Sequence, residues 1–371
     1  MSITQVEIQL LAVVTAVACA LPGVFLVLRR TAMMSDAISH TVLLGIVIGF
    51  FIVEDLTSPW LILGAAAVGV LTVSLVALLQ RTRLVKEDAA IGLVFPALFS
   101  IAVILISRFA GDVHLDTDAV LVGEIAFAPF DRLVASGRDL GPRGFYVMGG
   151  ILLLNLAFIL AFYKELKIST FDAALAATLG FIPAVLHYAL MALVSVTVVG
   201  AFDIVGSILV VALIIAPPAA AYLLTDRLPR MLGLSALIGA LSGVGGYWLA
   251  YLLDASIAGS IAAMAGLLFA LAFTFAPDRG LIAIARRRAK QRWGFARAML
   301  AIHLLNHEGS EKALVENREN HLREHLRWEP GFARQVVRQS IERDLIVRVD
   351  DQLSLTEQGR SFAEEALLDT T

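Results

Sequence analysis

Long apolar runs, each close to the length of a membrane-spanning helix, recur through the first three quarters of this 371-residue chain. About 20 apolar residues suffice for a helix to cross a bilayer. Apolar side chains make up 58% of the sequence and charged ones 16%, whereas soluble domains average about 45–50% and about 25%. This composition excludes a soluble enzyme for most of the chain, and also a disordered or fibrous protein. Spans are expected at about 7–28, 37–53, 60–80, 89–107, 145–163, 179–200, 203–224, 231–253 and 257–277.

We therefore predict an all-α polytopic membrane bundle of eight or nine transmembrane helices over residues 1–285. The windows 37–53 and 203–224 decide the count, because both contain ionisable groups. Pro217 and Pro218 interrupt the second of these windows and are expected to bend it, either to line a pathway or to serve packing. After about residue 286 the sequence becomes that of a small soluble domain, which we place at 286–371.

Small residues four apart predict close contacts between helix backbones. Two such pairs lie within the spans, Gly45 with Gly49 and Gly239 with Gly243. They favour a compact bundle over separate helices.

Basic residues mark every second connection between the spans, at 29–30, 81–86, 164–167, 227–230 and 279–292. The connections at 1–6, 54–59, 201–202 and 254–256 hold neither Lys nor Arg. Because cytoplasmic loops carry the excess of Lys and Arg, the N-terminus is expected outside and the tail in the cytoplasm. The connection 108–144 disagrees, since it carries arginines outside. We expect a re-entrant or interfacial helix at 120–130.

Asp36 and His40 are the ionisable pair most suited to chemistry inside the membrane. Ionisable groups within a span cost at least a few kcal/mol at the bilayer centre and are functional candidates by default. A spacing of four residues stacks both side chains on one helix face. A carboxylate and an imidazole suit Mn²⁺, Fe²⁺ or Zn²⁺. If the helix begins near Arg30, His40 lies roughly 15 Å inward. The alternative is an Asp–His hydrogen bond that only holds neighbouring helices together.

Three further ionisable residues are weaker candidates. Asp203 stands at the start of a predicted span and is either a metal ligand or a helix N-cap. Glu124 falls in the segment whose placement is ambiguous. His187 is alone on an apolar helix, where a packed histidine is the favoured interpretation.

Two absences from the sequence limit the chemistry. No Gly-x-x-x-x-Gly-Lys-Ser/Thr loop occurs, so the chain cannot hydrolyse ATP through a P-loop of its own. No His-Glu-x-x-His motif occurs, which argues against a zinc protease. The single cysteine, Cys19, permits no disulfide within the chain.

The stretch 28–40, which ends in Ser-Asp-Ala-Ile-Ser-His, resembles the permease subunit of manganese, zinc and iron ABC transporters. The resemblance covers about residues 10–277 and recurs at 86–92, 120–129, 164–180 and 201–221. It implies a subunit that imports divalent metal ions across the bacterial inner membrane and is not itself an enzyme. The transported Mn²⁺, Zn²⁺ or Fe²⁺ is cargo, and no permanently bound cofactor is expected.

The same resemblance implies partners and residue roles. The partners are a separate ATPase, an extracellular or periplasmic metal-binding protein, a second permease that is identical or related, and membrane lipid. Asp36 and His40 match the intramembrane metal pair, whereas Asp203 matches a more variable position. The docking block for the ATPase contains Lys164, Glu165, Phe171 and Asp172.

The tail predicts helices at 293–312, 316–328 and 330–343, a hairpin of 346–349 with 353–355, and a last helix from 356. This order resembles the winged helix of metal-dependent regulators of the diphtheria-toxin-repressor type, and so implies an α+β domain. Residues 293–371 hold 10 basic and 14 acidic residues, whereas DNA-binding domains are usually basic. A regulatory or protein-docking role is therefore favoured over nucleic-acid binding.

Two histidine pairs in the tail, at a spacing of four residues, can bind a metal on one helix face. The alternative is histidines that are simply exposed or packed in the core. The pairs are His303 with His307 and His321 with His325.

Two other functions remain open from the sequence. The chain can be a membrane-tethered, metal-responsive regulator, or a secondary cation transporter that works alone. The Asp36 and His40 pair argues against the first, because an anchor needs no charge inside the membrane. The block 164–180 argues against the second.

Overall fold

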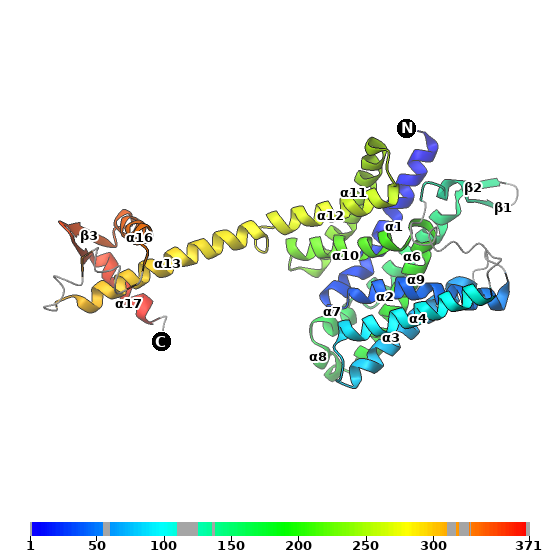
Figure 1. Ribbon diagram of the computed structural model, residues 1–371, viewed down its shortest axis with the longest axis horizontal. Helices are drawn as coiled ribbons and strands as arrows, with labels where there is room; N and C mark the ends of the chain where they lie inside the picture. Colours follow the sequence, from blue (N-terminus) through cyan, green and yellow to red (C-terminus); the bar gives the residue numbers. More distant parts are fainter. Residues whose placement is uncertain are drawn as a thin grey trace. The chain divides into compact units, whose positions relative to one another are not determined.

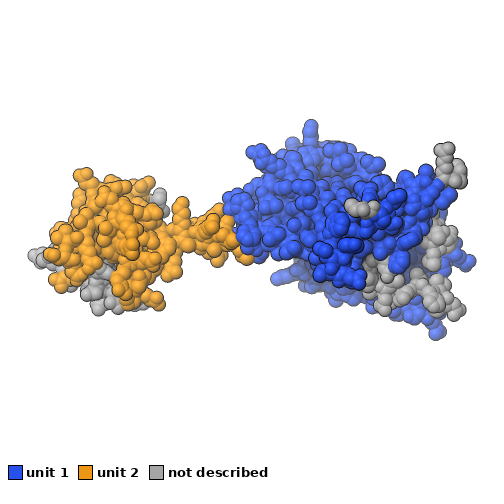
Figure 2. All heavy atoms as spheres, turned by 90° about the horizontal axis from the view of Figure 1, so that it is seen from above, with its two compact units in different colours: residues 1–280 blue, residues 281–371 orange. Residues whose placement is uncertain are grey.

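The computed structural model describes residues 2–54, 60–109, 125–135, 138–309, 317–318, 326 and 328–368. Figure 1 shows helices along most of the chain and two short hairpins. By their internal contacts the residues form two compact units, 1–280 and 281–371, which are coloured separately in Figure 2.

Nine helices within the described part of the chain are long and apolar enough to cross a membrane, which confirms the upper of the two predicted counts. The windows 37–53 and 203–224 each correspond to one of them. The nine are α1 (Ile3–Leu28), α2 (Met33–Val53), α3 (Trp60–Arg81), α4 (Glu87–Phe109), α6 (Arg143–Ala161), α9 (Pro183–Val205), α10 (Ser207–Leu224), α11 (Leu228–Leu253) and α12 (Ile257–Phe275).

Helix α1 is the centre of the first unit and packs against α6, α9, α10 and α11. Its middle turns carry small buried side chains, among them Ala12 and Ala16. A Cβ added at Gly239 or Gly243 of α11 would lie 3.2 Å from the backbone of Ala16 or Ala12, respectively. The predicted small-residue contact is therefore real, because two backbones meet there.

Helix α2 packs against α3 and α4, and the three lie side by side in Figure 1. The contact with α3 is close at Gly45, where an added Cβ would lie 2.4 Å from Cα of Ala65. This approach fixes the position of α2 in the bundle.

The break between α9 and α10 falls at Gly206 rather than at 201–202. Gly206 has φ of +77°, a conformation that glycine adopts without steric cost, and its N–H donates to the Phe202 carbonyl at 3.0 Å. Helix α9 therefore continues to Val205, and Asp203 lies in its last turn. The prediction that Asp203 begins the next span or caps it is wrong, because Gly206 occupies that position.

Pro217 and Pro218 do not interrupt α10, which is continuous through both. Proline lacks an N–H, so Pro218 leaves the Ile214 carbonyl without its donor in the helix. That carbonyl faces Gly23 of α1, where an added Cβ would lie 2.1 Å from its oxygen. Close packing against α1 accompanies the missing hydrogen bond, so α10 is not broken at the two prolines, and the expected bend stays a prediction.

Two short helices, α7 (Tyr163–Phe171) and α8 (Ala173–Thr178), connect α6 to α9. Leu166 is fully buried in one apolar cluster with Phe25 of α1. The Asp172 carboxylate accepts the Leu175 N–H at 2.9 Å and caps α8.

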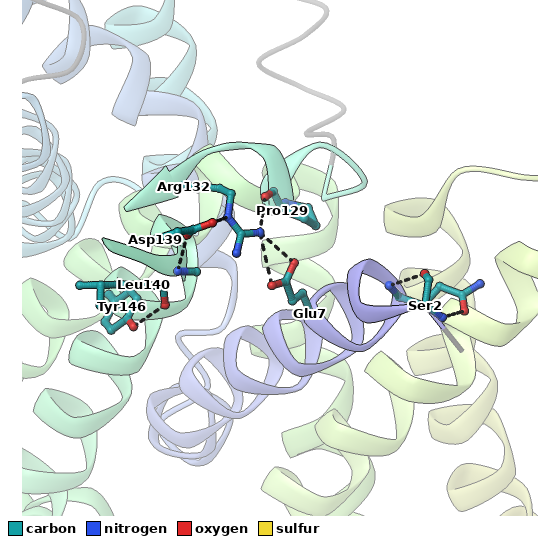
Figure 3. A network of polar contacts seen from close by, with 9 residues as sticks. Ser2, Glu7, Pro129, Arg132, Asp139, Leu140 and Tyr146 are labelled. Atoms are coloured by element: carbon teal, nitrogen blue, oxygen red, sulfur yellow. Dashed lines mark hydrogen bonds and ion pairs between the residues drawn. The ribbon is translucent and has the colours of Figure 1, made fainter. Parts of the chain in front are cut away.

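A hairpin of β1 (Arg132–Ala135) and β2 (Arg138–Pro142) precedes α6, and the prediction of an all-α bundle missed it. Figure 3 shows Arg132 bonded to Asp139 across the hairpin and reaching Glu7 of α1 at 3.4 Å. The Gly141 N–H, followed by the Arg132 guanidinium, holds the pKa of the Asp139 carboxyl below its usual range. These contacts connect the hairpin to the start of α1.

The helix expected at 120–130 is wrong in its described part. Residues 120–124 lie outside the described residues, 125–127 form a turn, and η1 (Ala128–Phe130) is a single 3₁₀ turn. Pro129 has no N–H to donate to a longer helix, which is one reason why the chain turns here.

The second unit contains α13 (Leu281–His307), α16 (Pro330–Glu342), β3 (Ile346–Val349), β4 (Gln352–Leu355) and α17 (Glu357–Leu368). The predicted hairpin, the helix before it and the last helix are confirmed. Helix α13 begins and ends earlier than the predicted 293–312. The apolar core consists of Ala296, Leu300, Leu304, Val336, Val337, Leu345, Ile346 and Leu353.

The helix predicted at 316–328 does not begin as expected. The Asn317 carbonyl accepts the Leu353 N–H at 3.0 Å, and Arg318 forms an antiparallel bridge with Gln352. These two residues extend the hairpin because β4 offers its backbone there. Most of the segment after them lies outside the described residues.

Replacing Gly45 by Ala should destabilise the bundle, because the new methyl group has no space beside Ala65. Overpacking of this kind typically costs about 1–3 kcal/mol. Thermal unfolding of the purified protein in detergent measures the effect. Gly149→Ala in α6 is the matched control, since nothing lies within 4 Å of a Cβ there. Equal midpoints for the two variants would contradict the close α2–α3 contact.

Candidate metal site

Asp36 and His40 lie on one face of α2, in its first turns. Nε2 of His40 is 3.5 Å from Oδ1 of Asp36. In the single chain the Asp36 side chain is 35% exposed and the His40 side chain is 31% exposed. Ser35 and Ser39 beside them are buried. The pair therefore lies at the edge of the bundle formed by this chain, and not in its core.

The pair is closer to the start of its helix than the sequence suggested. Helix α2 begins at Met33, not near Arg30, because residues 29–32 form a turn. At about 1.5 Å per residue, His40 lies about 10 Å along the helix rather than 15 Å. His40 therefore lies nearer to the end of α2 that follows Arg29 and Arg30 than the predicted depth implied.

Two phenylalanines of α4 hold the His40 ring. Phe95 stacks on it with centroids 5.4 Å apart, and Phe99 meets it edge-on at 6.3 Å. The hydroxyls of Ser35 and Ser39 donate to backbone carbonyls of their own segment. The carboxylate of Asp36 and the imidazole of His40 are thus the groups placed to bind a ligand.

The spacing of the two groups suits a shared metal ion. Two ligands about 2.0–2.1 Å from a tetrahedral Zn²⁺ lie about 3.4 Å apart, close to the observed separation. Among the residues that the structure describes, however, no group of three His, Cys, Asp or Glu side chains could hold a metal. The described chain therefore brings together two groups of the kind that bind metals, and a complete coordination shell would need ligands from elsewhere.

Among the described residues, Asp203 and His187 are not brought to this pair. Asp203 is exposed in the last turn of α9, and the charges that act on it are those of Arg143 and Asp131. Glu124 lies outside the described residues. His187 lies in the second turn of α9 with its ring against Tyr188 at 5.7 Å, as expected for a packed histidine.

In the tail, one of the two histidine pairs can be described. The rings of His303 and His307 meet at 4.7 Å on α13, and His303 is buried. His321 and His325 lie outside the described residues, so their relation to the first pair stays a prediction.

The predicted docking block forms α7 and α8. Lys164 and Asp172 are exposed, Glu165 is half-buried and Phe171 is 62% exposed. Three further apolar side chains are exposed along the same segment, Leu175, Leu179 and Ile182. Sequence reasoning missed these three, although apolar residues in a short connection between two spans were the available signal.

Arg29 is a fourth residue of interest that the sequence did not indicate. Its Nε donates to Oγ1 of Thr170 at 3.1 Å, and its Nη2 donates to Oγ of Ser169 at 2.9 Å. The basic pair 29–30 was used only for orientation, because nothing in the sequence shows which distant hydroxyl a guanidinium meets.

Comparison with known proteins agrees with this fold. Residues 4–276 match the model of the ABC 3 transport family. The zinc transport system membrane protein TroD of Treponema pallidum is 49% identical over 361 residues, 97% of this chain and 98% of that protein. The manganese transport system membrane protein MntD of Bacillus subtilis is 51% identical over 270 residues, 73% of this chain and 91% of that protein.

Among solved structures, PsaBC from Streptococcus pneumoniae in complex with Fab has a TM-score of 0.63 and 30% identity, and the match covers 75% of this chain and 94% of that one. The fold is that of a multi-pass transport subunit of an ABC transporter. The chain belongs to the ABC 3 transport family.

If the partly exposed His40 side chain faces a water-filled pathway rather than lipid, His40→Cys should react with a water-soluble thiosulfonate reagent. Ser39→Cys is the matched control and should stay unlabelled, since Ser39 is 1% exposed. The native Cys19 is fully buried and should not react either. Labelling of His40→Cys by apolar reagents alone would contradict a pair that faces water.

Proposed function

We propose that this chain is the permease subunit of an ATP-driven importer of divalent transition-metal ions, and that the metal passes Asp36 and His40. The observation that carries the proposal is a partly exposed carboxylate–imidazole pair inside a membrane helix of an ABC 3 family member. TroD is named for zinc transport and MntD for manganese transport, which supports Zn²⁺ or Mn²⁺ as cargo, with Fe²⁺ as the alternative.

A second permease, identical or related, completes the site in this proposal. Asp36 and His40 supply two ligands, and both are open at the edge of the single chain. Zn²⁺ takes four ligands, and Mn²⁺ takes more. A copy of the same pair from a facing subunit would supply the next two. Partial exposure then has a physical reason, because a pair buried within one chain could not share a metal.

A separate ATPase supplies the energy, and we place its contact at α7 and α8. The chain has no phosphate-binding loop of its own. The exposed row of Phe171, Leu175 and Leu179 offers apolar surface on a segment flanked by Lys164 and Lys167. The distribution of Lys and Arg puts this segment in the cytoplasm and the N-terminus outside. A metal-binding protein delivers the ion on the outer side.

The tail serves regulation in this proposal, as a winged-helix-like domain. The match to TroD covers 97% of this chain, whereas that to MntD covers 73% of this chain but 91% of MntD. MntD, which is named for manganese transport, thus matches only part of this chain over most of its own length. This supports a transport unit that works without the tail and a tail that adjusts it.

Asp36→Asn and His40→Ala should each reduce uptake of ⁶⁵Zn or ⁵⁴Mn at least about tenfold, because even an outer-shell partner of a metal typically contributes 10–100-fold. Uptake is measured in cells that co-express the chain with its ATPase and its metal-binding protein. Asp254→Asn is the matched control, since Asp254 caps α11 in a left-handed conformation that asparagine also tolerates. Normal uptake by both site variants, at wild-type membrane levels, would remove the pair from the pathway.

A chain that ends after Arg292 should still import metal but should lose its response to cytoplasmic metal. The test compares initial uptake rates in cells preloaded with Zn²⁺ or Mn²⁺ and in depleted cells. With the full chain, the initial uptake rate should differ between preloaded and depleted cells. With the shortened chain, the two rates should be equal. The regulatory role would be wrong if both chains responded alike.

A further inference from the structure

The turn between α1 and α2 has a fixed backbone. Arg30 has φ of +61°, its N–H donates to the Val27 carbonyl at 3.1 Å, and the Thr31 N–H donates to the Leu26 carbonyl at 3.0 Å. This is the Schellman arrangement, which satisfies the last carbonyls of a helix. Helix α2 follows immediately, with the Met34 N–H on the Thr31 carbonyl at 3.0 Å. Any displacement of this turn therefore reaches Asp36 within one helical turn.

The Arg29 side chain joins this turn to the end of α7, 140 residues further along the chain. Its guanidinium donates through two different nitrogens, to the hydroxyls of Ser169 and Thr170. Both acceptors lie in the last turn of α7, directly before Phe171 and Asp172 of the predicted docking block. Two donors in the fixed plane of a guanidinium define a direction as well as a contact.

Helix α7 is attached to the bundle independently of the Arg29 guanidinium. Leu166 already attaches α7 to the bundle, because it is fully buried in one cluster with Phe25, Leu21 and Leu190. Tyr163, at the start of α7, packs against the same cluster. The cluster therefore holds the first half of α7 through apolar contacts, which are not directional, and does not include its last turn. The half-buried Arg29 holds the last turn of α7 through directional hydrogen bonds to Ser169 and Thr170. Both acceptors are neutral hydroxyls, so replacing them leaves no buried carboxylate without a partner.

We propose that Arg29 is a positioning residue that couples the ATPase-docking helices to the helix that carries Asp36 and His40. It connects movement of α7 to the α1–α2 turn through Ser169 and Thr170. The inference rests on the proposed function, since it assumes a partner ATPase at α7 and α8 and a metal at Asp36 and His40. Its specific claim is that these hydrogen bonds link hydrolysis to metal movement.

A coupling residue has a signature that a merely structural residue lacks. Loss of folding or of docking lowers ATP hydrolysis and metal uptake together. Loss of the connection between α7 and α2 lowers the number of metal ions moved per ATP hydrolysed. The ratio of the two rates is therefore the quantity to measure.

The experiment uses the full chain, assembled with its ATPase and second permease in liposomes that contain excess metal-binding protein. Uptake of ⁶⁵Zn and ⁵⁴Mn is measured against phosphate release. Arg29→Gln should lower the ratio about tenfold, and Ser169→Ala combined with Thr170→Val should lower it by a similar factor. The variant with all three changes should have the same lowered ratio as Arg29→Gln or as the Ser169 and Thr170 variant, since each set of changes removes the same hydrogen bonds. Arg29→Lys should give an intermediate ratio, because an ammonium group lacks the planar fork.

Arg30→Gln is the matched control, since it changes the adjacent arginine and should leave the ratio unchanged. An unchanged ratio in Arg29→Gln, or a triple variant whose loss is the product of the two, would overturn the inference. If Arg29→Gln fails to fold, the Ser169 and Thr170 variant decides: a lower ratio supports the connection and a wild-type ratio overturns it. A wild-type complex that hydrolyses ATP but imports neither ion would instead overturn the proposed function, and this inference with it.

Discussion

Satisfaction of backbone polar groups in the membrane is the constraint on which this structure depends. In lipid each N–H and C=O needs a partner within the protein, so the chain crosses as helices. Helices can then approach closely only where side chains are small. Helix α1 meets this condition with Ala12, Ala16 and Gly23, against which α10 and α11 pack. The Ile214 carbonyl, which Pro218 leaves without a donor, lies at such a contact.

The same constraint explains why the sequence predicted the helices well and their ends less well. Apolar runs of the right length have few alternatives in a bilayer, so all nine expected windows correspond to helices within the described residues. The ends depend on single residues. Gly206, at φ of +77°, ends α9 after Asp203 rather than before it, and no apolar window reveals that difference. The hairpin 132–142 was missed in part because Arg132 reaches Glu7 of α1, a contact between residues 125 apart that no local pattern reveals.

The proposed site is partly local and partly tertiary. The spacing of Asp36 and His40 is a property of one helix, and it needs no other element. The stacking of Phe95 on His40 requires α4 to lie beside α2, and the exposure of the pair depends on which helices cover α2 and which do not. Asp203 illustrates the limit of spacing arguments, because it fits a family motif and still lies apart from the pair in the described structure.

The sequence by itself determined the class of protein, the positions of the apolar membrane helices and the one-face spacing of Asp36 and His40. These follow from hydropathy, from the 3.6-residue period of a helix and from the cost of charge in lipid, all of which act over short stretches of chain. Tertiary structure alone decided that Arg29 meets Ser169 and Thr170, and that Asp36 and His40 stay open at the edge of one chain. Both depend on the packing of helices far apart in sequence, and residue types alone do not specify which distant groups packing brings together.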